Sequence, residues 1–173
     1  MPALALDTRL PADAETLARL ISERHSCRGY HPRQVPRETI DTMLTIAQGA
    51  ASWCNSQPWQ VIVTEGEETE RFRDALYNFA TSQNWADQSQ RPEQPDFPFP
   101  ARYVGIYKER QRATGWALYE SVGVAHGDRV GSGKQMHENF RHFGAPHEKR
   151  NTTEEYLGTY GAIDCGAYVA HVM

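Results

Sequence analysis

Apolar residues recur at helical spacing in several parts of the chain. The first apolar stripe follows Asp13, a suitable N-cap, at positions i, i+3, i+4 and i+7, and predicts a helix that ends near Arg24. A second stripe follows Pro36, a residue that suits the first turn of a helix, and Gly49 closes it. A third stripe follows Gly66. We therefore expect three helices in the first half of the chain.

The tendency to form β-strand is concentrated in one segment. Trp59 to Thr64 has three branched apolar residues at its centre and predicts a strand. Four prolines between residues 86 and 102 exclude a regular helix or a central strand, so we expect an extended arm there. Further helices are expected over about 105–124, 128–143 and 161–173.

The composition is that of a folded soluble domain. The chain has 173 residues, of which 39% are apolar, so we expect one domain over residues 1–173 with a true core. Eighteen basic and 22 acidic residues give a net charge of −4, which argues against nucleic acid as a partner. Because the sequence shows no long apolar run and no signal peptide, we expect no membrane partner and a cytoplasmic protein.

Cysteine and histidine spacing does not indicate a metal site. The three cysteines are far apart and odd in number, so reduced thiols are expected rather than a disulfide framework. His137, His142 and His147 recur every five residues, a spacing that does not place them on one face of a helix. We predict neither metal ligands nor a catalytic nucleophile.

Basic residues are concentrated between Arg24 and Arg33. This segment reads Arg-His-Ser-Cys-Arg-Gly-Tyr-His-Pro-Arg and contains no acid, although the whole chain is net acidic. Guanidinium groups with an interleaved serine hydroxyl suit a phosphate, because charge-assisted hydrogen bonds to phosphate oxygens are among the stronger ones in proteins. The alternative interpretation is a solvated basic turn, which composition alone favours.

Amides, hydroxyls and indoles are concentrated between Ser52 and Trp59, just before the predicted strand. Asparagine and glutamine offer both donors and acceptors, which the pyrimidine side of a flavin or a nucleic-acid base requires. The alternative interpretation is a polar turn with Trp59 in the core.

Taken together, the two clusters resemble the flavin-dependent nitroreductase family. The chain has Arg-His-Ser-x-Arg after its first helix and, about 25 residues later, Ala-Ser-x-x-Asn-Ser-Gln-Pro-Trp entering a strand. The similarity extends through 139–146 and 158–167. Ala51 stands where the family commonly has proline.

The resemblance implies an α+β fold: a helix-rich, nitroreductase-like sandwich that forms a homodimer with FMN bound at the subunit interface. The residues implied to bind the flavin are Arg24, His25, Ser26 and Arg28 of the first cluster and Ser52, Trp53 and Asn55 of the second. The first group is implied to hold the phosphate and the pyrimidine side of the ring. The second group is implied to reach the flavin from the partner subunit.

The activity implied by the resemblance is transfer of hydride from NAD(P)H through FMN to a small aromatic acceptor, a nitroaromatic or quinone-type compound. No protein nucleophile is required, because the reactivity resides in the cofactor. Arg28 is implied to tune the flavin as well as bind it, since a cation beside the ring stabilises the negative charge that reduction adds.

Two departures from the family affect the expected fold. Family members continue beyond the last residue of this chain, so we expect the family's C-terminal part to be missing. Residues 147–153 are polar where the family has an apolar strand, and a sheet covered on both faces does not easily hold such residues. We therefore expect a single strand and an incomplete central sheet. The alternative function is a flavin-free helical interaction module derived from this fold.

Overall fold

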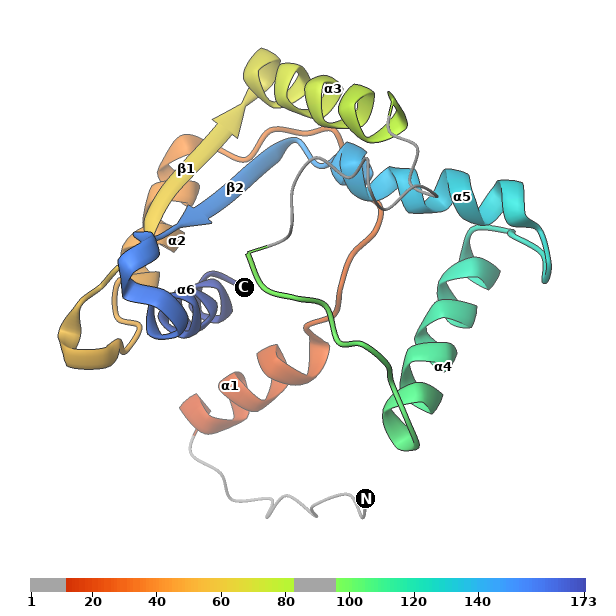
Figure 1. Ribbon diagram of the computed structural model, residues 1–173. Coiled ribbons are helices and arrows are strands. Elements are labelled where there is room, and N and C mark those ends of the chain that lie inside the picture. Colours follow the sequence, from red (N-terminus) through yellow and green to blue (C-terminus); the bar gives the residue numbers. More distant parts are fainter. Residues whose placement is uncertain (1–11, 83–95) are drawn as a thin grey trace. The chain divides into compact units, whose positions relative to one another are not determined.

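The computed structural model describes residues 12–82 and 96–173, in which α-helices predominate over a small β-sheet (Figure 1). The α-helices and strands are α1 (Ala12–Glu23), α2 (Arg37–Ala47), β1 (Gln60–Glu65), α3 (Gly66–Ser82), α4 (Ile106–Ser121), α5 (Arg129–His137), β2 (His147–Thr152) and α6 (Gly158–Val172). Short 3-10 helices lie between them: η1 (Trp53–Asn55), η3 (Glu138–Gly144) and η4 (Glu155–Leu157).

The described chain forms two compact units. Unit 1 contains the described residues of Met1–Arg28 together with Val35–Ile62 and Lys149–Met173. Unit 2 contains Gly29–Gln34 and the described residues of Val63–Glu148. Both predicted site segments therefore belong to unit 1.

The core of unit 1 forms where α2 packs against α6. Tyr168 of α6 is fully buried and stacks on the buried Trp59, with ring centroids 4.8 Å apart. Gln48 joins the two rings: its Oε1 accepts a hydrogen bond from Trp59 Nε1 (3.0 Å), and its Nε2 donates to the Tyr168 hydroxyl (3.4 Å). Ala47 and Ala50 complete this core. The polar atoms of both large rings are thus satisfied inside an apolar cluster.

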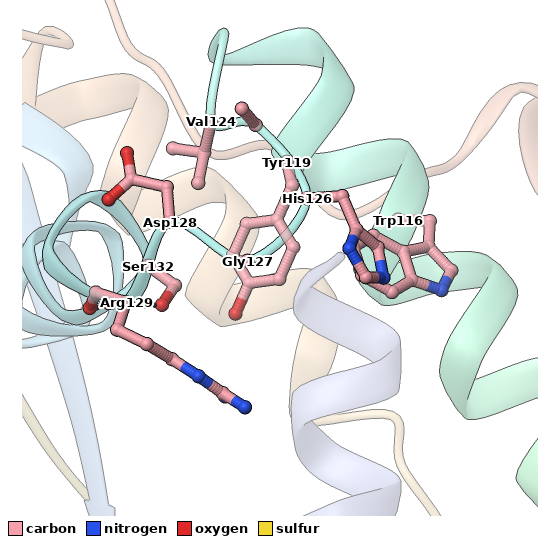
Figure 2. A pocket seen from close by; sticks show the side chains of 9 residues that line it. Trp116, Tyr119, Val124, His126, Gly127, Asp128, Arg129 and Ser132 are labelled. Atoms are coloured by element: carbon pink, nitrogen blue, oxygen red, sulfur yellow. Dashed lines mark hydrogen bonds between the residues drawn. The ribbon is translucent and has the colours of Figure 1, made fainter.

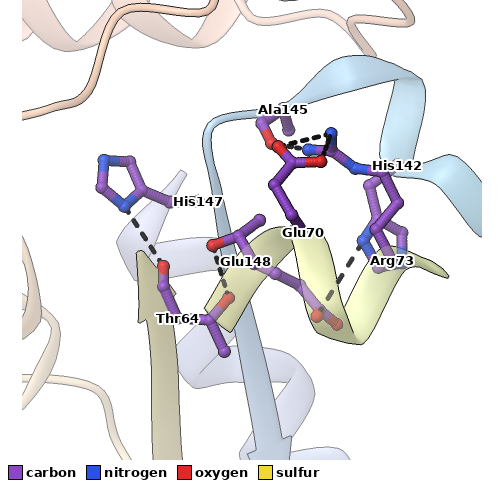
Figure 3. A network of polar contacts seen from close by, with 8 residues as sticks. Thr64, Glu70, Arg73, His142, Ala145, His147 and Glu148 are labelled. Carbon is purple, nitrogen blue, oxygen red and sulfur yellow. Dashed lines mark hydrogen bonds and ion pairs between the residues drawn. The ribbon is translucent and has the colours of Figure 1, made fainter. Parts of the chain in front are cut away.

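In unit 2, α3 packs against η3 and α5. Phe72 of α3 stacks on His142 of η3, with centroids 5.8 Å apart. Arg73 donates to the Glu70 carboxylate and to the Ala145 carbonyl, so one guanidinium connects α3 to the chain that follows η3 (Figure 3). These contacts hold the chain just before it enters β2.

The expectation of a single strand was wrong, because β2 pairs with β1 in a two-stranded antiparallel sheet (Figure 1). Side chains alternate between the two faces of a strand, so Arg150 and Thr152 lie on one face of β2, and both are exposed. Several of its half-buried polar side chains form hydrogen bonds. His147 Nδ1 donates to the Thr64 carbonyl (3.2 Å; Figure 3), and Lys149 Nζ donates to Asn151 Oδ1 (2.8 Å). Hydrogen bonds of this kind offset the free-energy cost of removing polar side chains from water, which was the reason for expecting no strand here.

The predicted helices are confirmed, with two differences in their ends. The helix expected over 128–143 stops at His137 and continues as the 3-10 helix η3, within which His142 and Phe143 have positive φ. The last helix starts earlier than expected, at Gly158.

The extended arm was predicted over residues 86–102. Its part up to residue 95 lies outside the residues that the structure describes, and residues 96–102 are irregular. No helix in the described parts of the chain is long and apolar enough to cross a membrane.

We predict that Tyr168→Ala lowers the free energy of unfolding by about 3–5 kcal/mol, since it removes a fully buried ring and leaves a cavity against Trp59. Tyr156→Ala is the matched control, because that tyrosine is 83% exposed; a change below about 0.5 kcal/mol is expected. Urea unfolding measures both. Equal effects of the two substitutions would contradict the role given to Tyr168.

Candidate functional site

The site residues of the first predicted cluster, which lie between Arg24 and Arg28, belong to the connection between α1 and α2, and each of them is exposed. His25 Nδ1 donates to the Glu23 carbonyl (2.9 Å), and the other nitrogen of the ring, Nε2, lies 3.5 Å from Cys27 Sγ. The imidazole is therefore folded back toward the end of α1. Exposed guanidinium and hydroxyl groups on such a loop are accessible to an anion and can donate hydrogen bonds to it.

The second predicted cluster forms η1 and the turn after it. Ser52 Oγ accepts a hydrogen bond from the Gln57 backbone N–H (2.9 Å), which closes the turn. Cys54, Asn55 and Gln57 all have positive φ, between 44° and 54°. This left-handed conformation costs a residue other than glycine about 1–2 kcal/mol, so surrounding contacts must hold it in place.

Helix α6 supplies these contacts. Asp164 is buried, and its carboxylate accepts hydrogen bonds from the Trp53 backbone N–H (3.1 and 3.3 Å) and from Ser56 Oγ (3.4 Å). One turn earlier, the ring of Tyr160 lies against the Trp53 indole, with centroids 5.0 Å apart. The predicted site residue Trp53 is thus positioned through both its backbone and its side chain.

The two clusters occupy different segments of unit 1: one follows α1, and the other lies between α2 and β1. Within the second cluster, the structure brings Ser52, Trp53 and Asn55 onto one short turn.

Burial on and beside α6 shifts the pKa of several groups and raises that of the Tyr168 hydroxyl. Burial lowers the pKa of Lys149, whose Nζ lies 5.1 Å from the centroid of the Tyr168 ring. Burial also raises the pKa of the Cys165 thiol, and the neighbouring Asp164 carboxylate raises it further. A higher pKa leaves less thiolate, so Cys165 is a poor nucleophile near neutral pH.

Unit 2 contains a cavity of about 260 Å³ between α4 and α5 (Figure 2). Trp116 and His126 stack on one side of it, with centroids 4.7 Å apart. Asp128 is the N-cap of α5 and its carboxylate accepts a hydrogen bond from the Gly131 N–H (2.8 Å). In the described residues, no three His, Cys, Asp or Glu side chains are grouped as metal ligands would be.

A family model described as the nitroreductase family matches residues 21–169, which include both predicted clusters. The chain belongs to the nitroreductase family. The family predicted from the two motifs is therefore confirmed.

Curated relatives and a solved structure agree with this membership. The chain is 31% identical over 165 residues to nitroreductase NfnB of Mycolicibacterium smegmatis, covering 92% of this chain and 65% of that protein. It is 28% identical over 154 residues to chloronitrobenzene nitroreductase of Comamonas testosteroni, covering 89% of this chain and 66% of that protein. The chain thus spans slightly less than two thirds of the length of these relatives.

The solved structure is that of the FMN-dependent nitroreductase NfnB from Mycobacterium smegmatis in complex with NADPH. It superposes with a TM-score of 0.80 and 28% identity, over 92% of this chain and 68% of that one. The predicted α+β nitroreductase fold is confirmed by this likeness.

Sequence reasoning missed Asp164 and Tyr160. The only signal was an acid in the middle of a helix of small and apolar residues, a place where a carboxylate is expected to have a partner. Nothing in the sequence indicates that the partner is a turn more than 100 residues earlier.

We predict that Cys54→Gly raises the free energy of unfolding by roughly 0.5–1 kcal/mol, because glycine adopts its φ of 52° without strain. Cys27→Gly is the matched control, an exposed cysteine outside the left-handed region; it should lower the stability by up to about 1 kcal/mol. Urea unfolding distinguishes the two. An equal loss in both variants would show that η1 is not strained.

Proposed function

We propose that this member of the nitroreductase family is an FMN-dependent oxidoreductase that passes hydride from NAD(P)H to nitroaromatic or quinone-type acceptors. One observation carries the proposal: the two donor-rich segments expected to hold the flavin are both accessible, in a chain that resembles an FMN-dependent nitroreductase solved with NADPH.

The donor set fits FMN. Arg24, Ser26 and Arg28 present two guanidinium groups and a hydroxyl, which suit the ribityl phosphate and the pyrimidine oxygens. When bound, FMN supplies two-electron redox chemistry. Arg28 would bring positive charge to the pyrimidine side of the ring, and His25 would add a contact from the same loop.

Ser52, Trp53 and Asn55 would complete the site from the partner subunit of a homodimer. Asn55 Oδ1 lies 3.4 Å from Gln57 Nε2, a long contact that the amide can exchange for a ligand without much loss. The Trp53 indole remains 61% exposed although Tyr160 packs against it, so apolar surface is available for a flat ring. On this view the two compact units are parts of one nitroreductase-like domain.

The names of the relatives support the choice of acceptor. Chloronitrobenzene nitroreductase and 4-nitrobenzoate reductase are among them, so a substituted nitrobenzene is the first acceptor to test. A quinone is the second, because it also accepts hydride as a flat ring.

The proposal predicts that the chain, mixed with FMN and desalted, keeps the flavin absorption band, and that NADPH or NADH bleaches it under nitrogen. Arg28→Ala should weaken FMN binding by about 10- to 100-fold, the loss expected for a charge-assisted hydrogen bond. Arg33→Ala is the matched control, since this exposed arginine is outside the proposed site; its Kd should stay within about twofold.

A folded chain that keeps no flavin would contradict the proposal. Dimerisation or partner binding unaffected by FMN and by Arg24→Ala would then support the alternative, an interaction module of the same fold.

Cysteine labelling gives a second test, because each proposed segment contains one exposed cysteine: Cys27 in the first and Cys54 in the second. In the apoprotein, both should react with iodoacetamide faster than Cys165, whose thiol pKa is raised by burial. Saturating FMN should slow Cys27 and Cys54 severalfold and leave Cys165 unchanged. Peptide mass spectrometry measures the three rates. Equal slowing of all three would indicate general stabilisation instead of binding at these loops.

A further inference from the structure

We infer that Asp164 is a positioning residue for the flavin: from the interior of α6 it fixes the turn that presents Ser52, Trp53 and Asn55. This inference rests on the proposed function, and it assigns a role to a residue outside the predicted site. All the contacts of Asp164 described below lie within unit 1.

One face of α6 contacts the connection between α2 and β1 at three successive turns. Tyr160 lies against the Trp53 ring, Asp164 accepts from the Trp53 N–H, and Tyr168 stacks on Trp59. These positions are i, i+4 and i+8, so they lie one above the other on the helix. The apolar contact at Tyr168 sets the distance of the connection from α6, and Asp164 sets the orientation of its polar turn.

Asp164 is 6% exposed, and the hydrogen-bond donors to its carboxylate come from η1 and the residue that follows it. A buried carboxylate is stable only if it is hydrogen-bonded, so the turn and the helix constrain one another. The bond to the Trp53 N–H fixes the Ser52–Trp53 peptide plane at the start of η1, one residue before Cys54 and Asn55, the two residues of η1 held at positive φ. Without this bond, the strained turn can relax and the side chains of Ser52 and Asn55 change direction.

The test compares the wild-type chain with Asp164→Ala and Asp164→Asn. Asparagine keeps an acceptor oxygen in the same place, whereas alanine removes it. We expect the Trp53 amide to exchange hydrogen at least about tenfold faster in D164A than in wild type, and FMN to bind at least about tenfold more weakly. D164N should restore both values to within about threefold of wild type.

Asp128→Ala is the matched control, because Asp128 also accepts a backbone N–H, but at the start of α5 in unit 2. It should lower the urea midpoint without changing Trp53 exchange or the FMN Kd. If D164A does not fold, Tyr160→Leu replaces it: this exposed ring contacts Trp53 from the same face of α6, and its loss should weaken FMN binding about threefold.

An unchanged FMN Kd in D164A, with the Trp53 amide released, overturns the inference. So does a Kd weakened equally by D164A and D128A, because the effect would then follow stability alone. If the wild-type chain binds no FMN, the proposed function fails and the flavin role of Asp164 fails with it, while Trp53 exchange in the apoprotein still decides whether Asp164 holds η1.

Discussion

The stacking of Tyr168 on Trp59 is the contact on which the organisation of unit 1 depends. It joins α6 to the start of β1, and Gln48 ties both rings to the end of α2. The buried apolar core of this unit is small, so two aromatic rings provide most of its large buried surface. Each polar atom on those rings has a partner, which keeps the cost of burying them low.

This contact also explains how an exposed turn is kept in order. Once α6 is placed by Tyr168, Asp164 and Tyr160 face η1 from the same side of the helix. A loop that binds a ligand has to be accessible, yet it loses affinity if it must be ordered at each binding event. In this chain Asp164 and Tyr160 of α6 hold the turn from one side, and the Trp53 indole stays exposed.

The sequence was a good guide where local pattern determines structure. Helical stripes and the apolar strand were predicted, and both donor-rich clusters lie in connections between these elements, where most of their residues are exposed. Family membership followed from the order of two short motifs. The prediction failed at β2, where polarity was taken to exclude a strand. The groups that bond to its side chains, such as the Thr64 carbonyl for His147, come from elsewhere in the chain, so no local sequence pattern indicates them. The Asp164 contact was missed for the same reason, because periodicity reports on neighbours along a helix but not on distant segments.

The sequence distance between these partners has a consequence for folding during synthesis. The hydrogen bond between Gln48 and Tyr168 spans 120 residues, and unit 1 is assembled from separate stretches of the chain with unit 2 in between. Trp59 and the apolar face of α2 leave the ribosome long before Tyr168 is made, so they remain uncovered while the intervening residues are translated. Such late closure slows folding and exposes apolar surface to other nascent chains. The nascent protein therefore has a period in which chaperones would have to protect the region that later carries the candidate site.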